Sequence, residues 1–166
     1  MAPTGVGAPD VLLGVDPGLA ATGWALVDGD SRVARHGTIR TRPGLLGPRL
    51  LQIVNELRQV LAAHPVTEAA LEELFMGRNA TSALAVAQAR GAVMAALAAA
   101  DVTVFEYKPA QVKSVLTGYG MADKSQMGRM LALQVGVEGH LDEHAADAVA
   151  IAVCHVRSRR LRQVGA

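Results

Sequence analysis

The stretch VLLGVDPGLAATG, residues 11–23, contains the first strand of the fold and its first charged side chain. Val11 to Asp16 is an apolar run that Pro17 and Gly18 end at once, which is typical of a buried strand followed by a turn. An ionised aspartate at the end of a buried strand needs a partner that offsets its loss of hydration, and a bound cation is such a partner. The stretch therefore predicts a strand with a cation site at its end.

Length and composition limit the rest of the chain. Its 166 residues suffice for one domain with a real core, but not for two lobes of ordinary size. We expect an N-terminal extension over residues 1–10, one domain over residues 11–160 and a basic tail over residues 161–166. A signal-peptide core and an unbroken run of about 18 apolar residues are both absent, which predicts a cytoplasmic protein without a membrane span. Cys154 is the only cysteine, which excludes disulfide frameworks and predicts a buried thiol.

Basic residues cluster along the chain although the net charge is only +1. Two segments hold these clusters, with Lys108, Lys113 and Lys124 in the first and Arg157, Arg159, Arg160 and Arg162 in the second. Such clusters are typical of phosphate binding, but a solvated helix face gives the same pattern. Both interpretations stay open for the lysines, and the solvated face is favoured for the arginines.

The predicted elements alternate between strands and helices after an initial group of three strands. Apolar runs between turn residues predict strands, and apolar residues at a spacing of three to four predict helices. We expect strands at residues 11–16, 22–27, 33–39, 68–74 and 102–107, and helices at 50–61, 82–100, 111–116, 124–135 and 143–160, with a mobile loop at 117–122. Residues 68–74, taken alone, fit a helix equally well, and Asp142 is placed to cap the last helix. This order predicts an α/β fold in which helices flank a mixed five-stranded sheet.

Acidic residues from three distant segments indicate one metal site. Asp16 ends the first strand, Glu72 lies in the fourth, and Asp147 follows His144 by one helical turn, so those last two share a helix face. Adjacent strand residues point to opposite faces of a sheet, so Glu72 and Glu73 cannot both join one site if this segment is extended. Clustered carboxylates are the ligands that hard divalent cations require.

Four segments resemble a known family. In this order and spacing, the chain resembles the RuvC family of Holliday-junction resolvases through DPGLAATG, LEELFMGRNATSALAVAQARG, FEYKPAQVKSVLTGYGMADKSQM and HAADAVAIAV. The first segment alone also resembles the phosphate loop of actin-like ATPases, whereas the second and third are long and specific. The resemblance covers about Val11 to His155. It implies a ribonuclease H-like fold and a homodimeric crossover junction endodeoxyribonuclease that nicks two strands of like polarity in recombination and repair.

The resemblance also implies the catalytic residues and metal ligands. The family's acidic site falls on Asp16, Glu72 and Asp147, with His144 where many relatives have another aspartate. With two Mg²⁺ or Mn²⁺ ions per site, the expected reaction is in-line hydrolysis of a phosphodiester, because such ions lower the pKa of water and stabilise the leaving oxygen. An imidazole suits Mn²⁺ better than Mg²⁺. Whether His144 is a metal ligand or a general acid or base stays open.

Further residues are assigned to DNA and to partners by the same resemblance. The expected DNA contacts are Phe75, Met76, Arg78, Asn79, Lys113, Tyr119 and Lys124, where the aromatic rings would stack on bases and the cations would hold phosphates. Core packing is the ordinary role of a phenylalanine. Arg90 and Gly91 lie on an alanine-rich helix that would contribute to the two-fold interface, although a buried core helix has the same composition. A branch-migration helicase of the RuvA-RuvB type is the expected partner complex.

Three other functions fit part of the sequence. An actin-like ATPase would explain residues 16–23, but it needs a second lobe and a second phosphate loop, for which the chain has no room. A related ribonuclease H-like nuclease could act on RNA or on other branched DNA. A non-catalytic junction-binding protein is disfavoured because all the candidate metal ligands are present.

Overall fold

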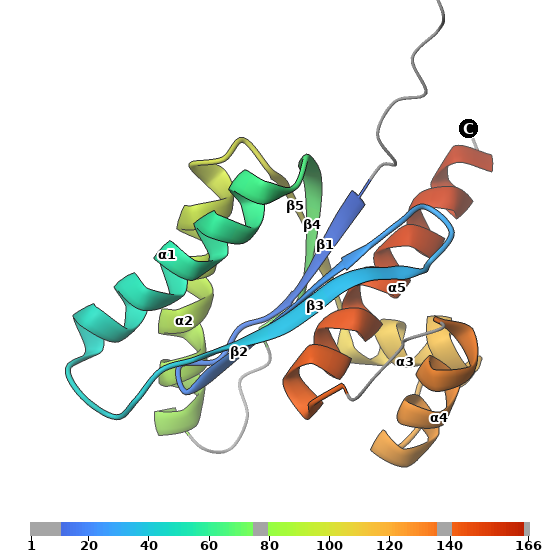
Figure 1. Ribbon diagram of the computed structural model, residues 1–166. Helices are drawn as coiled ribbons and strands as arrows, with labels where there is room; N and C mark the ends of the chain where they lie inside the picture. The colour runs from blue at the N-terminus through green and yellow to red at the C-terminus, as the bar shows by residue number, and fades with distance from the viewer. Residues whose placement is uncertain (1–10, 75–79, 136–140, 165–166) are drawn as a thin grey trace, which may run out of the picture.

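The computed structural model describes residues 11–74, 80–135 and 141–164, which form a five-stranded sheet with helices on both faces (Figure 1). The strands are β1 (Val11–Asp16), β2 (Ala21–Val27), β3 (Val33–Arg40), β4 (Val66–Glu72) and β5 (Thr103–Tyr107). Their order in the sheet is β3-β2-β1-β4-β5. The pairs β1–β2 and β2–β3 are antiparallel, and the pairs β1–β4 and β4–β5 are parallel. The mixed sheet confirms the predicted α/β fold.

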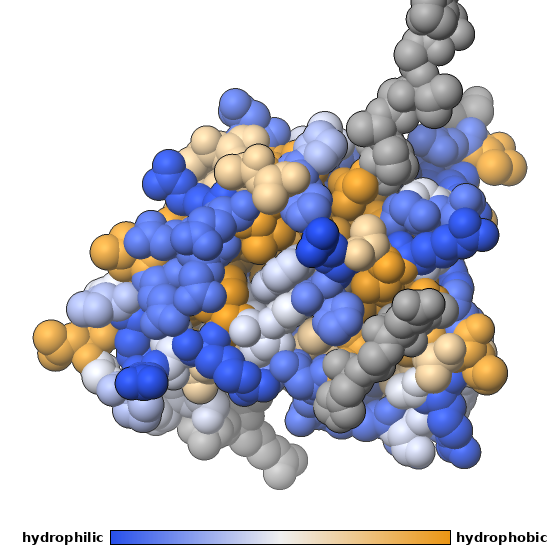
Figure 2. Space-filling view, in the orientation of Figure 1, coloured by the Kyte–Doolittle hydropathy of each residue, from blue (hydrophilic) through white to orange (hydrophobic). Residues whose placement is uncertain are grey.

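Two groups of helices cover the two faces of the sheet. Helices α1 (Leu46–Ala63) and α2 (Ala80–Ala98) lie on one face, and α5 (Glu143–Val164) crosses the other with α3 (Pro109–Thr117) and α4 (Lys124–Gln134) beside it (Figure 1). Hydrophilic residues cover most of the outer face of α1 (Figure 2), while Ile53 and Leu57 on its inner face are fully buried. Buried side chains of these helices therefore build a separate core on each side of the sheet.

Strand β4 resolves the segment whose sequence fitted a strand or a helix. Its consecutive residues Ala69, Ala70 and Leu71 are all fully buried. Burial on both sides is expected because β4 pairs with parallel strands at both edges, and helices cover both of its faces. A strand buried in this way shows no alternation in its sequence, which is why periodicity could not identify it.

Two glycines allow α5 to pack closely on β1 and β2. A Cβ atom on Gly23 would lie 1.9 Å from the carbonyl oxygen of His144, and one on Gly14 would lie 2.1 Å from that of Ala148. Any larger residue would push the helix away from the sheet. Because Gly23 pairs with Asp16 across β1 and β2, this contact places the first turn of α5 beside the end of β1.

The C-terminal arginines belong to a helix that packs on the fold. The sequence predicted a helix end at residue 160 and a basic tail from residue 161, but α5 continues to Val164. The Arg157 guanidinium donates a hydrogen bond to the Val115 carbonyl (3.1 Å), and that of Arg162 lies 5.2 Å from the centre of the Phe105 ring. These contacts join Arg157 and Arg162 to the rest of the fold, while residues 161–164 are exposed.

Cys154 lies inside the core, as its sequence context predicted. The residue has no exposed surface, and burial raises the pKa of its thiol to about 11. The thiol is therefore protonated and inert at neutral pH.

Helix α2 has an unusual distribution of apolar residues. By length and composition its segment Thr81–Ala98 is apolar enough to cross a membrane, and it is the one such helix in the described part of the chain. Ala89, Val93 and Leu97 are fully buried in the core between α2 and the sheet. Leu84, with 59% of its surface exposed, lies outside that core together with Met94.

Candidate active site

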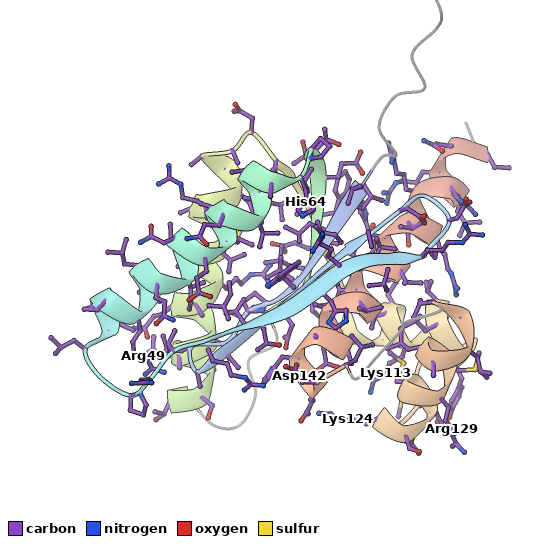
Figure 3. The ribbon with its side chains drawn as sticks, viewed as in Figure 1. Arg49, His64, Lys113, Lys124, Arg129 and Asp142 are labelled. Atoms are coloured by element: carbon purple, nitrogen blue, oxygen red, sulfur yellow. The ribbon has the colours of Figure 1, made fainter. Side chains whose placement is uncertain are left out.

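A network of hydrogen bonds fixes the turn that follows Asp16. The Thr22 hydroxyl donates a hydrogen bond to the Gly18 carbonyl (2.8 Å) and accepts one from the Gly18 amide (3.3 Å). Arg49, labelled on α1 in Figure 3, donates to the Leu19 carbonyl (3.2 Å). The end of β1, and with it Asp16, therefore has a defined position. Sequence reasoning missed the role of Thr22, whose only signal was its place six residues after the aspartate.

Three predicted carboxylates meet in one cavity of about 450 Å³. Asp16 enters from the end of β1, Glu72 from the end of β4 and Asp147 from the first turns of α5. Helices α3 and α4 form the opposite wall. Glu73 follows the end of β4 and does not line the cavity, as the alternation of strand side chains predicted. The structure thus brings together side chains that are more than 50 residues apart in the sequence.

The three carboxylates share one electrostatic environment. Burial raises the pKa of Asp16, of Glu72 and of Asp147 above their ordinary values. Repulsion raises the pKa of Glu72 and of Asp147 further, since Asp16 and Asp147 both act on Glu72, and Asp16 acts on Asp147. Ionising all three costs free energy that a nearby cation would offset.

His144 contacts the site through Asp16. Its Nδ1 atom lies 3.2 Å from Asp16 Oδ2, and this contact lowers the pKa of Asp16 against the larger effect of burial. The imidazole is not among the described side chains that line the cavity. The close approach of α5 at Gly23 places the histidine here.

The donor set fits hard divalent cations. Carboxylate oxygens with one imidazole nitrogen suit Mg²⁺ and still better Mn²⁺. Among the described residues, however, no group of three such side chains is close enough to hold an ion as it stands. The chemistry of the donors nevertheless fits divalent metal ions.

Two predicted lysines face the carboxylates. Lys113 of α3 and Lys124 of α4 line the cavity, and Figure 3 shows them near the beginning of α5, where Asp142 is labelled. The positive charge of Lys113 lowers the pKa of Glu72 against the effect of burial. Lys124 forms an ion pair with Glu143, and this hydrogen bond raises the pKa of its ammonium group. Sequence reasoning missed Glu143, the exposed partner of Lys124 at the rim of the cavity.

Asp142 caps α5 as predicted and also ties it to the sheet. Its Oδ1 atom accepts hydrogen bonds from the Ala145 amide (2.9 Å) and from the Thr38 hydroxyl (2.8 Å). Its Oδ2 atom lies 3.1 Å from a guanidinium nitrogen of Arg40. Asp142 therefore fixes the start of α5 against β3. The sequence predicted its capping role but not these contacts with the sheet.

Of the other predicted DNA contacts, the structure describes only Tyr119. Phe75, Met76, Arg78 and Asn79 lie outside the described residues. Tyr119 is 61% exposed in the turn between α3 and α4.

The Arg90 side chain turns inward from α2, the helix that the sequence predicted near a partner subunit. Only 8% of its surface is exposed, because its guanidinium binds the Glu72 carbonyl and the Glu106 carboxylate of its own chain. Gly91, the next residue of α2, is exposed. The interface position of both residues stays a prediction.

Comparison with known proteins places these observations in one family. The family model described as crossover junction endodeoxyribonuclease RuvC matches residues 12–155. The crossover junction endodeoxyribonuclease RuvC of Chloroflexus aggregans is 47% identical over 148 residues, which cover 86% of this chain and 90% of that protein. The RuvC of Roseiflexus sp. is 46% identical, with 86% and 88% covered.

Solved structures show the same fold. Thermus thermophilus RuvC in complex with a Holliday junction substrate is 32% identical, with a TM-score of 0.86 over 92% of this chain and 96% of that chain. The yeast mitochondrial Holliday junction resolvase is 12% identical, with a TM-score of 0.67 over 96% of this chain and 83% of that chain, and supports the fold alone. The predicted ribonuclease H-like fold is confirmed.

Proposed function

This chain belongs to the RuvC family of crossover junction endodeoxyribonucleases, and we propose that it cuts DNA in the cavity lined by Asp16, Glu72 and Asp147. It is a Holliday-junction resolvase, a hydrolase acting on DNA in recombination and repair. The observation that carries the proposal for the site is the convergence of these three buried carboxylates, opposite two lysines, in one cavity. An actin-like ATPase is excluded by the family assignment.

The carboxylates would hold the divalent metal on which nucleases of this family depend. We assign two ions, Mn²⁺ or Mg²⁺, to Asp16, Glu72 and Asp147, with His144 as a further donor beside Asp16. Such ions supply an acidified water and stabilise the leaving oxygen. The raised pKa values support this role, because groups that repel one another when ionised gain most from a cation.

The lysines would position the scissile phosphate. Lys113 and Lys124 lie on the wall opposite the carboxylates, so an anionic strand can bind between the two groups of charges. An ammonium group acts on phosphate as a point charge and tolerates small changes in its position. Lys124 would exchange its contact with Glu143 for the phosphate.

DNA contacts outside the cavity follow from the family. We propose that Phe75, Met76, Arg78 and Asn79, which continue the chain just after Glu72, contact the junction near the cut. Tyr119 is exposed and available for stacking on a base. The Thermus thermophilus relative that was solved with a Holliday junction substrate supports the same substrate here.

We propose that the protein acts as a homodimer that pairs through α2. Leu84, Val86 and Met94 expose apolar surface on this helix, and Gly91 allows a close approach between helices. A second copy of the chain would cover this surface and would place two equivalent sites on a two-fold axis, as symmetric nicking requires. A branch-migration helicase of the RuvA-RuvB type and a cytoplasmic location complete the proposal, with residues 11–160 as one nuclease domain.

A cleavage assay on defined substrates tests the proposal. A synthetic mobile four-way junction should be cut symmetrically in Mn²⁺ or Mg²⁺, while linear duplex, single strands and RNA should remain intact. Preferential cutting of RNA or of another branched DNA would support the related nuclease instead. Tight junction binding without cutting in either metal would support a non-catalytic binding protein.

A further inference from the structure

Arg90 binds the end of β4 from the face of the sheet opposite the cavity. Its Nη1 atom donates a hydrogen bond to the Glu72 carbonyl (2.6 Å), and its Nη2 atom donates to Glu106 Oε1 (2.5 Å). Both bonds use one planar guanidinium group, which lies almost entirely buried on α2. The Glu106 side chain is exposed, but charge-assisted bonds from one planar, buried guanidinium have a defined geometry.

The hydrogen bonds of Arg90 and the cavity lie on opposite faces of the sheet. Ala70 and Tyr107 belong to the core under α5, whereas Leu71 belongs to the core under α2. Side chains alternate along a strand, so the Glu72 carboxylate points with Ala70 toward α5, and Glu106 points toward α2. Arg90 therefore holds the backbone of Glu72 and leaves its carboxylate free in the cavity.

The position of Glu72 at the end of β4 explains why the hydrogen bond from Arg90 to its carbonyl is important. Pairing between β1 and β4 ends at Val15 and Leu71, one residue before Glu72. On the other side, the amide of Glu73 donates to the Tyr107 carbonyl (2.8 Å). Without Arg90, Glu72 would lie at a strand end that the sheet holds from one side.

We propose that Arg90 is a positioning residue for Glu72, which it sets for metal binding through the backbone. This inference rests on the proposed assignment of Glu72 to the metal site. Partners that orient a metal ligand from outside typically affect metal affinity or activity about 10- to 100-fold. Arg90 would do so from an element that contributes no described side chain to the cavity wall.

Substitution by lysine tests the role, because Arg90→Lys keeps the charge but cannot bond the carbonyl and the carboxylate with one planar group. We expect Mn²⁺ binding, measured by calorimetry, to weaken about 10-fold or more, and single-turnover cutting to slow. Junction affinity in EDTA should stay within twofold of wild type. Arg160→Lys is the matched control, since Arg160 also bonds a backbone carbonyl and a carboxylate, those of Gly29 and Asp30, far from the cavity.

A double-mutant cycle separates positioning from a general structural role. If Arg90 acts through Glu72, then Arg90→Lys should weaken Mn²⁺ binding in the wild type but cause little further loss in Glu72→Gln. Equal losses in both backgrounds, or wild-type affinity for Mn²⁺ in Arg90→Lys, would overturn the inference. If Arg90→Lys does not fold, Glu106→Gln replaces it, with a smaller loss of Mn²⁺ affinity expected and an unchanged affinity contradicting the role.

The same variants distinguish this inference from the proposed function. Wild-type cutting and metal binding by Glu72→Gln would overturn the site itself. An inactive Glu72→Gln beside an unaffected Arg90→Lys would overturn the role of Arg90 alone.

Discussion

His144 Nδ1 lies 3.2 Å from Asp16 Oδ2, although 128 positions separate the two residues in the chain. The contact exists because β2 has no side chain at Gly23, where the backbone of α5 passes directly over the sheet. One imidazole and three carboxylates thereby gather at one end of β1 and β4.

Removal of a single carboxylate charge should nearly abolish cutting. We expect Asp16→Asn, Glu72→Gln and Asp147→Asn each to lose almost all activity on a four-way junction, because each removes a metal ligand while keeping side-chain volume. Junction binding should persist, since affinity for DNA rests mainly on basic residues. Rates and gel-shift affinities measured in Mn²⁺ provide the check. Near-normal cutting by any one variant would remove that residue from the site.

The same site should lower the stability of the metal-free protein. Burial raises the pKa of Asp147 in the folded state, so its ionisation at pH 7 favours the unfolded state. Asp147→Asn should therefore raise the Tm in EDTA, with about 2–4 °C for each kcal/mol gained in a chain of this size. Saturating Mn²⁺ should raise the Tm of the wild type and not that of the variant. A lower Tm for Asp147→Asn in EDTA would contradict the proposed repulsion.

The lysines in the cavity should differ from a lysine outside it. We expect Lys113→Ala and Lys124→Ala each to weaken junction binding and to reduce the slope of log affinity against log salt by about one. Lys108→Ala is the matched control, because Lys108 is exposed at the start of α3 and does not line the cavity. Binding measured from low to moderate salt decides the matter. Unchanged slopes in both cavity variants would make these lysines part of a solvated face.

His144 should set the choice of metal. An imidazole nitrogen favours Mn²⁺ over Mg²⁺, so the wild type should cut faster in Mn²⁺, and His144→Asp should reduce this ratio. Protons compete with metal for a ligating imidazole, so added Mn²⁺ should extend wild-type activity toward lower pH. The pH-rate profiles of both proteins in both metals test this. A slower His144→Asp with an unchanged metal ratio would indicate acid-base catalysis, and identical profiles would make His144 a bystander.

A second histidine should make the fold sensitive to acid. His155 is fully buried, with Nδ1 2.7 Å from the Tyr107 hydroxyl and Nε2 2.9 Å from Glu68 Oε2. Burial lowers its pKa below 6.5, against the opposing effect of Glu68. Below about pH 6.5 the unfolded state therefore binds the extra proton, and the free energy of unfolding falls by up to about 1.4 kcal/mol per pH unit.

Urea unfolding between pH 5 and 8 measures this dependence. The free energy of unfolding is plotted against pH for the wild type and for His155→Gln. The difference between the two slopes gives the contribution of His155, because the cavity carboxylates titrate in both proteins. Equal slopes would show that His155 does not titrate differently in the folded and unfolded states.

Several features were predictable because their causes are local in the chain. The apolar run Val11–Asp16 with its Pro-Gly turn predicted β1 to the residue, and Asp142 predicted the start of α5. Residue types at a characteristic spacing also identified Asp16, Glu72 and Asp147 as ligand candidates. Strand formation, helix capping and the choice of oxygen donors depend on neighbours along the chain, so the sequence alone determined them.

Other features depend on which segments meet in space. The strand state of residues 68–74 was ambiguous in the sequence, because burial between β1 and β5 decides it for β4. A solvated face was favoured for the arginine segment, yet Arg157 and Arg162 contact α3 and β5. Arg90 was predicted near a partner subunit, and no sequence signal indicated that it binds the Glu72 carbonyl. A long polar side chain can choose among many partners, and only the packed tertiary structure decides which of them lies within reach.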